Sequence, residues 1–161
     1  MAEAVIKLTV PGELAYRDVV IRTTAAACRL VRAGATQSST LAPLDLSDDF
    51  DAELVSAVSE IFNNIVIHGQ DETGTRGAGS VIEFELRLSD LELEVVITDT
   101  GPAFDIDSVP SPELESLPEG GMGIHIARSC VDALDYTPGP PNRWRLTKRA
   151  ARVAHRPSTQ A

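Results

Sequence analysis

One predicted helix constrains the fold of this chain more than any other segment. It can begin with Ser47 as its N-cap, and it runs to about His68. Its apolar residues recur with the alternating four- and three-residue spacing of a single helix face, which is typical of a helix with one buried side. These residues are Leu54, Val58, Ile61, Ile65 and His68. The pattern therefore predicts a helix that packs against other elements of the fold.

The segments around this helix predict a mixture of strands and helices. Alternating, often branched residues indicate strands, and apolar spacings of three and four indicate helices. The predicted strands are 5–10, 80–88, 91–98 and 143–147, the last being the second of a final pair, and the predicted helices are 13–33, 47–68 and 121–131. In this order the elements predict an α+β fold, a two-layer α/β sandwich with helices on one face of a mixed, mostly antiparallel sheet.

The two cysteines of the chain, Cys28 and Cys130, lie among apolar residues in predicted helices. No Cys-x-x-Cys pair or Cys/His cluster accompanies them, so we expect neither a zinc site nor a disulfide framework. Buried structural thiols are the favoured interpretation. The first predicted helix can bury Cys28 together with Leu14, Val20, Ile21 and Val31.

Length and charge exclude several classes of protein. A chain of 161 residues is one domain by default, and we expect this domain at 1–148 and a flexible basic tail at 149–161. No apolar run approaches the ~20 residues that span a bilayer, and the N-terminus lacks a signal-peptide pattern, so we expect a cytoplasmic protein. The net charge of −10 argues against direct binding to nucleic acid or to anionic membranes.

Glu60 and Asn64 lie four residues apart in the central helix, so their side chains project from the same face one turn apart. The Asn64 carbonyl oxygen can bind Mg²⁺, which prefers oxygen ligands, and Glu60 can accept a proton from an attacking hydroxyl or water. The isolated pair is better interpreted as a polar stripe facing solvent. However, the adjacent asparagines 63 and 64 are unusual in a helix rich in Ile and Val, because Asn is a weak helix former.

Two glycine-containing segments follow. Asp99 ends an apolar strand, where its carboxylate can accept a hydrogen bond from an exocyclic amine such as adenine N6, and Gly101 allows a ring to come close. Backbone N–H groups of a glycine-rich helix start can bind phosphate oxygens. The glycines at the start of the third helix are Gly120, Gly121 and Gly123.

Each of these segments is common by itself, and the glycines match neither the Walker A pattern nor the dinucleotide fingerprint. The three in this order indicate a nucleotide site. Because the chain supplies few cations near them, a metal ion would have to offset the phosphate charge.

Together the three segments resemble the N, G1 and G2 boxes of the ATP-binding superfamily that contains gyrase, the heat-shock chaperone, histidine kinases and the mismatch-repair ATPase. More narrowly, residues 57–69, 99–105 and 119–124 are similar to those of the bacterial anti-sigma-factor serine kinases. The opening strand, with Pro-Gly-Glu at 11–13 before the first helix, is similar as well. The resemblance covers roughly residues 5–148.

The resemblance implies a Bergerat ATP-binding fold. In such a fold Asn64 would coordinate Mg²⁺, Asp99 would bind adenine, and Gly101 would allow close packing at the base. The three glycines of the third helix would cap the phosphates of ATP under a lid spanning about 102–120. Thr147, on the last strand, matches a position that often supports the adenine-binding Asp through a hydroxyl or a water.

The same resemblance implies a reaction and its partners. Glu60 would be the general base toward a serine of a protein substrate, an anti-anti-sigma protein of the STAS type. The unmodified substrate would compete with a sigma factor for the kinase, and phosphorylation would release it. A homodimer is plausible because related proteins tend to pair.

The chain also departs from its relatives. Ala103 replaces the second glycine of the G1 box, and Pro118-Glu119 stands where some relatives place an arginine before the G2 glycines. Without that arginine, Mg²⁺ and backbone amides alone would stabilise the transferring phosphoryl group. An alternative function is therefore an ATP-binding module that sequesters a regulator without useful catalysis. A detached histidine-kinase domain is disfavoured, since the chain offers no dimerisation helix with a phosphoacceptor histidine.

Overall fold

The computed structural model describes residues 3–34, 49–69, 80–106 and 122–150, and the structural statements below concern these residues. Both the types and the order of the elements agree with the predicted α+β sandwich. In chain order they are β1 (Ala4–Pro11), the short 3₁₀ helix η1 (Leu14–Tyr16), α1 (Arg17–Gly34), α2 (Asp49–His68), β2 (Val81–Ser89), β3 (Glu92–Asp99), α3 (Met122–Cys130), β4 (Ala133–Thr137) and β5 (Asn142–Arg149).

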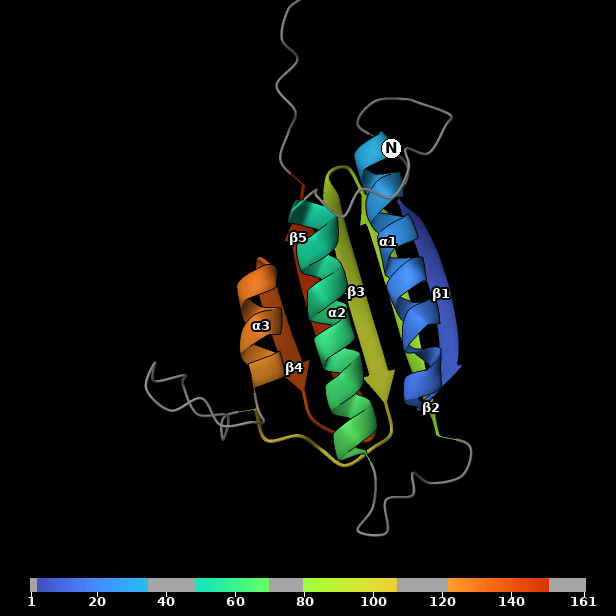
Figure 1. Cartoon of the computed structure of the whole chain (residues 1–161), viewed down its shortest axis with the longest axis vertical. Coiled ribbons are helices and arrows are strands. Elements are labelled where there is room, and N and C mark those ends of the chain that lie inside the picture. Colours follow the sequence, from blue (N-terminus) through green and yellow to red (C-terminus); the bar gives the residue numbers. More distant parts are fainter. Residues whose placement is uncertain (1–2, 35–48, 70–79, 107–121, 151–161) are drawn as a thin grey trace, which may run out of the picture.

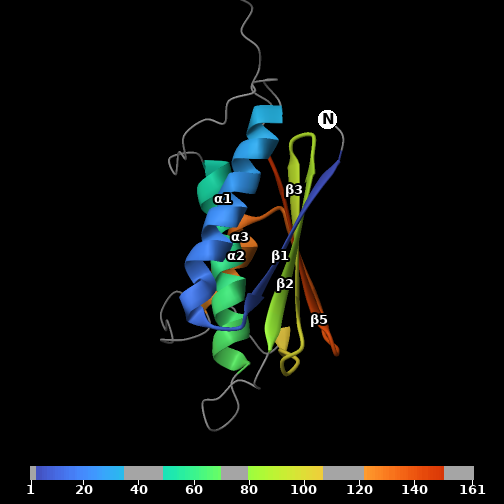
Figure 2. The same cartoon turned by 90° about the vertical axis from the view of Figure 1, so that its right-hand side faces the viewer.

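The five strands form one sheet in the order β1-β2-β3-β5-β4, and every pairing in it is antiparallel. All three helices cover the same face of this sheet, as the edge-on view in Figure 2 shows. Within the helical layer α2 packs between α1 and α3 (Figure 1). The predicted two-layer arrangement is therefore confirmed, and α2 lies over the middle of the sheet.

The core lies between α2 and the sheet. Leu54, Val58 and Ile61 of α2 are completely buried. Alternate residues of the central strands belong to the same core. His68, the last residue of the predicted apolar face, is instead exposed at the end of the helix. The inward-facing residues of β3 and β5 are Leu93, Val95, Ile97 and Asp99, and Asn142, Trp144, Leu146 and Lys148.

The first helix buries most of its predicted face. Val20, Cys28 and Val31 are each no more than 1% exposed, but Leu14 is 51% exposed. Leu14 belongs to η1, so it precedes the first turn of α1 and does not follow the direction of the buried face. Of the two cysteines that the sequence predicts to be buried, Cys28 is buried and Cys130 is partly exposed.

The end of the domain extends slightly beyond the predicted boundary at residue 148. β5 continues to Arg149, and the N–H of Ala150 donates to the carbonyl of Leu91 at 2.7 Å. Residues 151–161 of the predicted tail lie outside the described part of the chain. None of the described helices has the length and apolar character needed to cross a bilayer.

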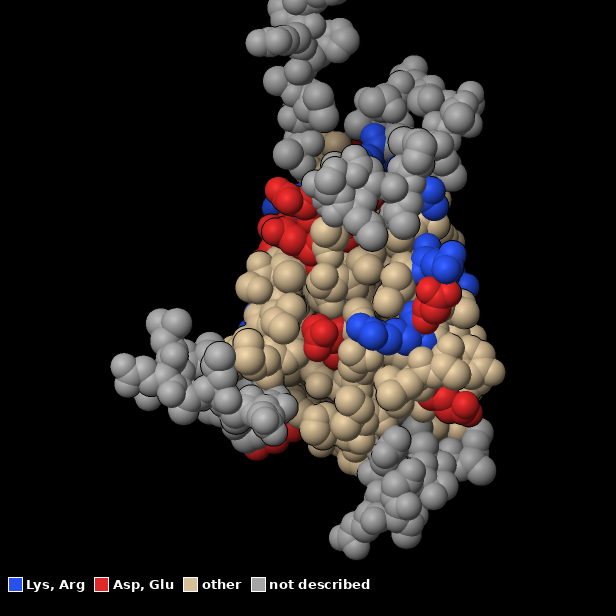
Figure 3. Space-filling model, in the orientation of Figure 1, with Lys and Arg blue, Asp and Glu red and all other residues tan. Residues whose placement is uncertain are grey.

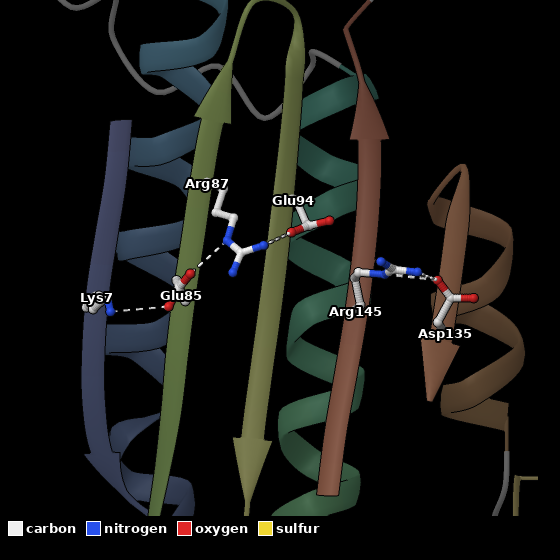
Figure 4. Close-up of polar contacts among 6 residues, drawn as sticks. All are labelled: Lys7, Glu85, Arg87, Glu94, Asp135 and Arg145. Atoms are coloured by element: carbon white, nitrogen blue, oxygen red, sulfur yellow. Dashed lines mark hydrogen bonds and ion pairs between the residues drawn. The ribbon is translucent and has the colours of Figure 1, made fainter. Parts of the chain in front are cut away.

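Opposite charges face each other across the strands on the face of the sheet that the helices do not cover (Figure 4). Arg87 of β2 lies 2.7 Å from Glu85 and 2.9 Å from Glu94 of β3. Hydrogen bonds from Arg87 and then from Lys7 hold the pKa of Glu85 below its ordinary value. Arg145 and Asp135 form a similar pair between β5 and β4 at 2.7 Å.

Candidate functional site

The first turn of α3 lies against α2 at the position of Glu60 and Asn64. A Cβ atom at Gly123 would lie 2.6 Å from Oε2 of Glu60 and 3.3 Å from Nδ2 of Asn64. Both distances are shorter than ordinary contacts, so a residue without a side chain is what allows the α3 backbone to come this close. The fold therefore brings Glu60, Asn64 and Gly123 to one place, although Gly123 is far from the other two in sequence.

The side-chain nitrogen of Asn64 is buried and has no hydrogen-bond partner among the described residues. Leaving a buried polar atom unpaired costs about 1–3 kcal/mol, so such an atom needs an explanation. A half-turn of the amide exchanges its nitrogen and oxygen, and the oxygen is a ligand that Mg²⁺ accepts. Asn64 thus offers an amide group that a bound ligand or ion can satisfy.

Asp99 ends β3 with its side chain almost fully buried. Its Oδ1 accepts hydrogen bonds from the N–H of Gly101 at 2.8 Å and from the side-chain nitrogen of Asn142 at 3.2 Å. No described group donates a hydrogen bond to the other carboxylate oxygen, Oδ2. The carboxylate therefore keeps one oxygen that can accept a hydrogen bond from a ligand.

Asn142 is a buried member of this cluster that the sequence patterns do not select. It is the first residue of β5 and lies directly opposite Asp99 in the register of β3 and β5. Its signal in the sequence is weak, because an Asn after a proline-rich turn is common in ordinary loops. Only the pairing of the two strands identifies it as a neighbour of Asp99.

The structure does not place Thr147 near Asp99, which corrects its expected supporting role. The register pairs Thr147 with Glu94, five residues before Asp99 on β3. Side chains of a strand alternate between the two faces of a sheet. Thr147 lies between the buried Leu146 and Lys148, so its side chain is on the uncovered face, whereas Asp99 is on the face that the helices cover.

A narrow pocket joins these groups. Three aromatic side chains form much of its wall: the Tyr136 and Trp144 ring centroids are 4.2 Å apart, and Phe104 lies 5.9 Å from Trp144. Flat apolar rings beside a hydrogen-bond acceptor suit a flat heterocycle with a polar edge. The lining residues are Asn64, Ile65, His68, Gly69, Asp99, Pro102, Phe104, Tyr136, Asn142 and Trp144.

Charge around the pocket is sparse. The described lining residues include neither Lys nor Arg. On the helix-covered face the basic side chains gather over α1, and most of the surface over the middle of the molecule is uncharged (Figure 3). His68 is exposed and has its ring centroid 5.7 Å from that of Phe104.

Part of the predicted site lies outside the described residues. Gly120 and Gly121, which the sequence assigns to phosphate binding, fall in the undescribed range 107–121, together with most of the expected lid and Pro118-Glu119. The beginning of that lid is described. There the N–H of Phe104 donates to the hydroxyl of Tyr136 at 2.7 Å.

Comparison with known proteins agrees with the fold. Residues 21–148 match the profile of the histidine kinase-like ATPase domain. The serine-protein kinase RsbW of Halalkalibacterium halodurans is 28% identical over 138 residues, which are 81% of this chain and 74% of that protein. An anti-sigma F factor of Clostridium botulinum is 33% identical over 98 residues, which are 58% of this chain and 66% of that protein.

A solved structure shows the same fold. The histidine kinase domain from the Erythrobacter litoralis EL346 blue-light activated histidine kinase superposes with a TM-score of 0.50 at 16% identity. The match covers 83% of this chain and 60% of that chain. At this identity the similarity concerns the fold alone.

Proposed function

This chain belongs to the family of histidine kinase-like ATPase domains, and on that premise we propose that it is an ATP-dependent protein-serine/threonine kinase and an anti-sigma factor. Its protein substrate is an anti-anti-sigma protein of the STAS type, and the partner that it sequesters is a sigma factor. The similarity to proteins named serine-protein kinase RsbW and anti-sigma F factor supports this proposal. The observation that carries it is the approach of Gly123 to Glu60 and Asn64 beside the Asp99 pocket.

In the proposed complex, adenine occupies the aromatic pocket. Its N6 amine donates to Oδ2 of Asp99, the carboxylate oxygen that no described group uses. The N–H of Gly101 donates to Oδ1 of Asp99 and so leaves Oδ2 to the base. Gly101 also has no side chain, which leaves room for the edge of the base. The triphosphate then extends toward the N-terminus of α3, where backbone N–H groups of Gly120, Gly121 and Gly123 bind its oxygens.

Asn64 is the residue proposed to hold Mg²⁺. The buried side-chain nitrogen of Asn64 has no described partner, and a half-turn of the amide would present its oxygen as a ligand instead. Mg²⁺ commonly takes few protein ligands and completes its shell with phosphate oxygens and water. A bound Mg²⁺ neutralises phosphate charge, which the described pocket lining does not do because it includes neither Lys nor Arg.

Glu60 is the proposed general base. It accepts the proton of the substrate serine hydroxyl while the serine oxygen bonds to the γ-phosphorus and the bond from that phosphorus to the β–γ bridging oxygen breaks. ADP leaves with the bridging oxygen. The closeness of Gly123 to Oε2 of Glu60 supports this role, because it leaves this carboxylate beside the start of α3, where the phosphates are proposed to bind.

Transfer of labelled γ-phosphate from ATP to the cognate STAS protein tests the proposal. The wild-type protein should label a serine of its substrate, and Glu60→Gln should lower the rate by about 10²–10⁴-fold without weakening ATP binding. Equal rates for the two proteins would exclude Glu60 as the base. Absence of any transfer by the wild type would contradict the kinase assignment.

A second candidate function is an ATP-binding module that sequesters its partner without phosphorylating it. The pocket lining without Lys or Arg and the sequence Pro118-Glu119 in place of an arginine favour it. Stable binding of a sigma factor together with no phosphate transfer under Mg-ATP would distinguish it from the kinase. For either function we propose one domain that includes β5 up to Arg149, a location in the cytoplasm and a homodimer as its assembly.

A further inference from the structure

We infer that Asn142 contributes to the nucleobase specificity of the pocket, because together with the N–H of Gly101 it fixes which oxygen of Asp99 is left to meet the base. This inference rests on the proposed binding of ATP and adds to it a residue outside the motifs in the sequence. Asn142 is 2% exposed and lines the same pocket as Asp99. It acts through Asp99 and is therefore a positioning residue.

The nitrogen of the Asn142 amide has three acceptors around it. It donates to the carbonyl oxygen of Gly101 at 2.9 Å, to that of Pro102 at 3.2 Å and to Oδ1 of Asp99 at 3.2 Å. If the amide were turned over, its oxygen would face three other oxygens. The amide orientation at this site is therefore determined by its surroundings, and an N–H group must face Asp99.

The oxygen of the same amide has two donors. The Tyr136 hydroxyl donates to it at 3.2 Å and the N–H of Gly139 at 3.1 Å. The Tyr136 hydroxyl in turn accepts from the N–H of Phe104. Asn142 is thus hydrogen-bonded to β4, to the turn before β5 and to the segment after β3. Through Tyr136, this network also connects the aromatic wall of the pocket to the carboxylate of Asp99.

This network has a chemical consequence for the ligand. Gly101 and Asn142 both donate to Oδ1 of Asp99, so Oδ2 remains as an acceptor without a described partner. An acceptor at this place favours a purine with an amine at C6, such as adenine. A purine with an oxygen at C6, such as hypoxanthine, would put two acceptors against each other and be rejected.

The test compares the dissociation constants of ATP and inosine 5′-triphosphate, which differ at C6. They are measured by isothermal titration with Mg²⁺ for the full chain, and thermal unfolding is followed for each variant. The wild type should prefer ATP. Asn142→Ala should reduce this preference by about tenfold, the size expected for a lost hydrogen bond to a charged group. Thr147→Ala, on the same strand but on the uncovered face, is the matched control and should leave the preference unchanged.

Asn142→Asp replaces the amide that donates to Asp99 by a second carboxyl group at the same place. It puts a second carboxylate within hydrogen-bond distance of Asp99, and two such groups share a proton that one of them can then donate. The preference should therefore shift toward inosine triphosphate, and more strongly as the pH falls. If Asn142 had only a structural role, its replacement would lower the melting temperature and weaken the binding of both nucleotides by the same factor.

Tyr136→Phe keeps the test decisive if the Asn142 variants do not fold. It removes one hydrogen bond to the amide, and also the acceptor of the Phe104 N–H, but leaves Asn142 and Asp99 in place. It should therefore lower the preference for ATP by a smaller factor of about three. An unchanged preference in the folded variants would overturn the role of Asn142 while ATP binding stands. A wild type that binds neither nucleotide would overturn the proposed function and this inference together.

Discussion

At the scale of single residues, the site depends on which side chains are missing or unpaired as much as on those that are present. Gly123 has no side chain, and the place that a Cβ atom would take lies against the carboxylate of Glu60. Asn64 contributes a buried amide with an unpaired nitrogen among the described groups. Both features are typical of a binding site and unusual for a core whose only role is packing.

Replacing Gly123 by Ala should lower the rate of phosphate transfer without lowering the stability of the protein. The new Cβ would lie 2.6 Å from Oε2 of Glu60, so this flexible carboxylate must move away. Ala favours a helix over Gly by about 1 kcal/mol, so the melting temperature should stay or rise, while phosphate transfer falls at least about tenfold. Gly139→Ala is the control, since its Cβ would meet only the carbonyl oxygen of Pro141 at an ordinary 3.5 Å. A fully active, correctly folded Gly123→Ala protein would contradict the proposed position of Glu60.

Asn64→Ala should remove the dependence of nucleotide binding on Mg²⁺. The wild type is expected to bind ATP more tightly with the metal than without it, and the variant to bind equally in both conditions, as measured by isothermal titration. Asn63→Ala is a matched control, because Asn63 is the neighbouring amide and does not line the pocket. If Asn64→Ala kept the wild-type response to Mg²⁺, the ligand assignment would be wrong.

At the scale of elements, the register of the sheet decides which residues can act together. The antiparallel pairing of β3 with β5 places Asn142 opposite Asp99 and Thr147 opposite Glu94. A change of one residue in this register would turn every side chain of β5 to the other face. The buried Trp144 and Leu146 oppose such a change, because they would then be exposed to solvent.

The charged rows of the uncovered face should make a small, pH-dependent contribution to stability. Glu85 has its pKa lowered from 4.5 by hydrogen bonds from Arg87 and Lys7. A carboxylate with a lowered pKa in the folded state stabilises the fold above its ordinary pKa, and this contribution is lost as the pH falls through the lowered value. Glu85→Gln should therefore lower the melting temperature at pH 7 by an amount on the order of 1 °C, since exposed ion pairs contribute little.

The measurement for this pair is thermal unfolding of the wild type and of Glu85→Gln at a series of pH values. The difference should be constant near neutral pH and should disappear as the pH falls through the lowered pKa of Glu85, where this carboxylate becomes protonated. The difference should also shrink in high salt, which screens exposed charges. A difference that grew with acid would show that Glu85 does not act through its ion pairs.

At the scale of the whole molecule, the fold brings Phe104, Tyr136 and Trp144 from separate segments into one wall of the pocket. Trp144 is the single tryptophan of the chain, is 2% exposed and belongs to the pocket lining. Nucleotide binding next to it should change its fluorescence, so the unmodified protein reports its own ligand.

Asp99→Asn should weaken the binding of ATP more than the binding of a purine triphosphate without the exocyclic amine, because Oδ2 of Asp99 is the proposed partner of that amine. Equal losses for the two ligands would mean that Asp99 has only a structural role.

The elements and their two layers could be predicted from local patterns of residues. The spacing of Leu54, Val58 and Ile61 within one helix, and the alternation of residues within each strand, are local patterns that burial enforces wherever the elements pack. The order of the elements was then enough to predict helices on one face of a mostly antiparallel sheet. The same local patterns picked out Glu60, Asn64, Asp99 and Gly123 as members of a possible site.

Contacts between residues far apart in the chain could not be predicted in this way and follow from the packing of the elements. The sequence suggested Thr147 as the support of Asp99, whereas the strand register assigns Asn142 to that place. The contact of Gly123 with Glu60 and the aromatic wall of Phe104, Tyr136 and Trp144 likewise join separate elements. The physical reason is that register and packing between elements depend on the simultaneous fit of many buried side chains, which a local pattern does not contain.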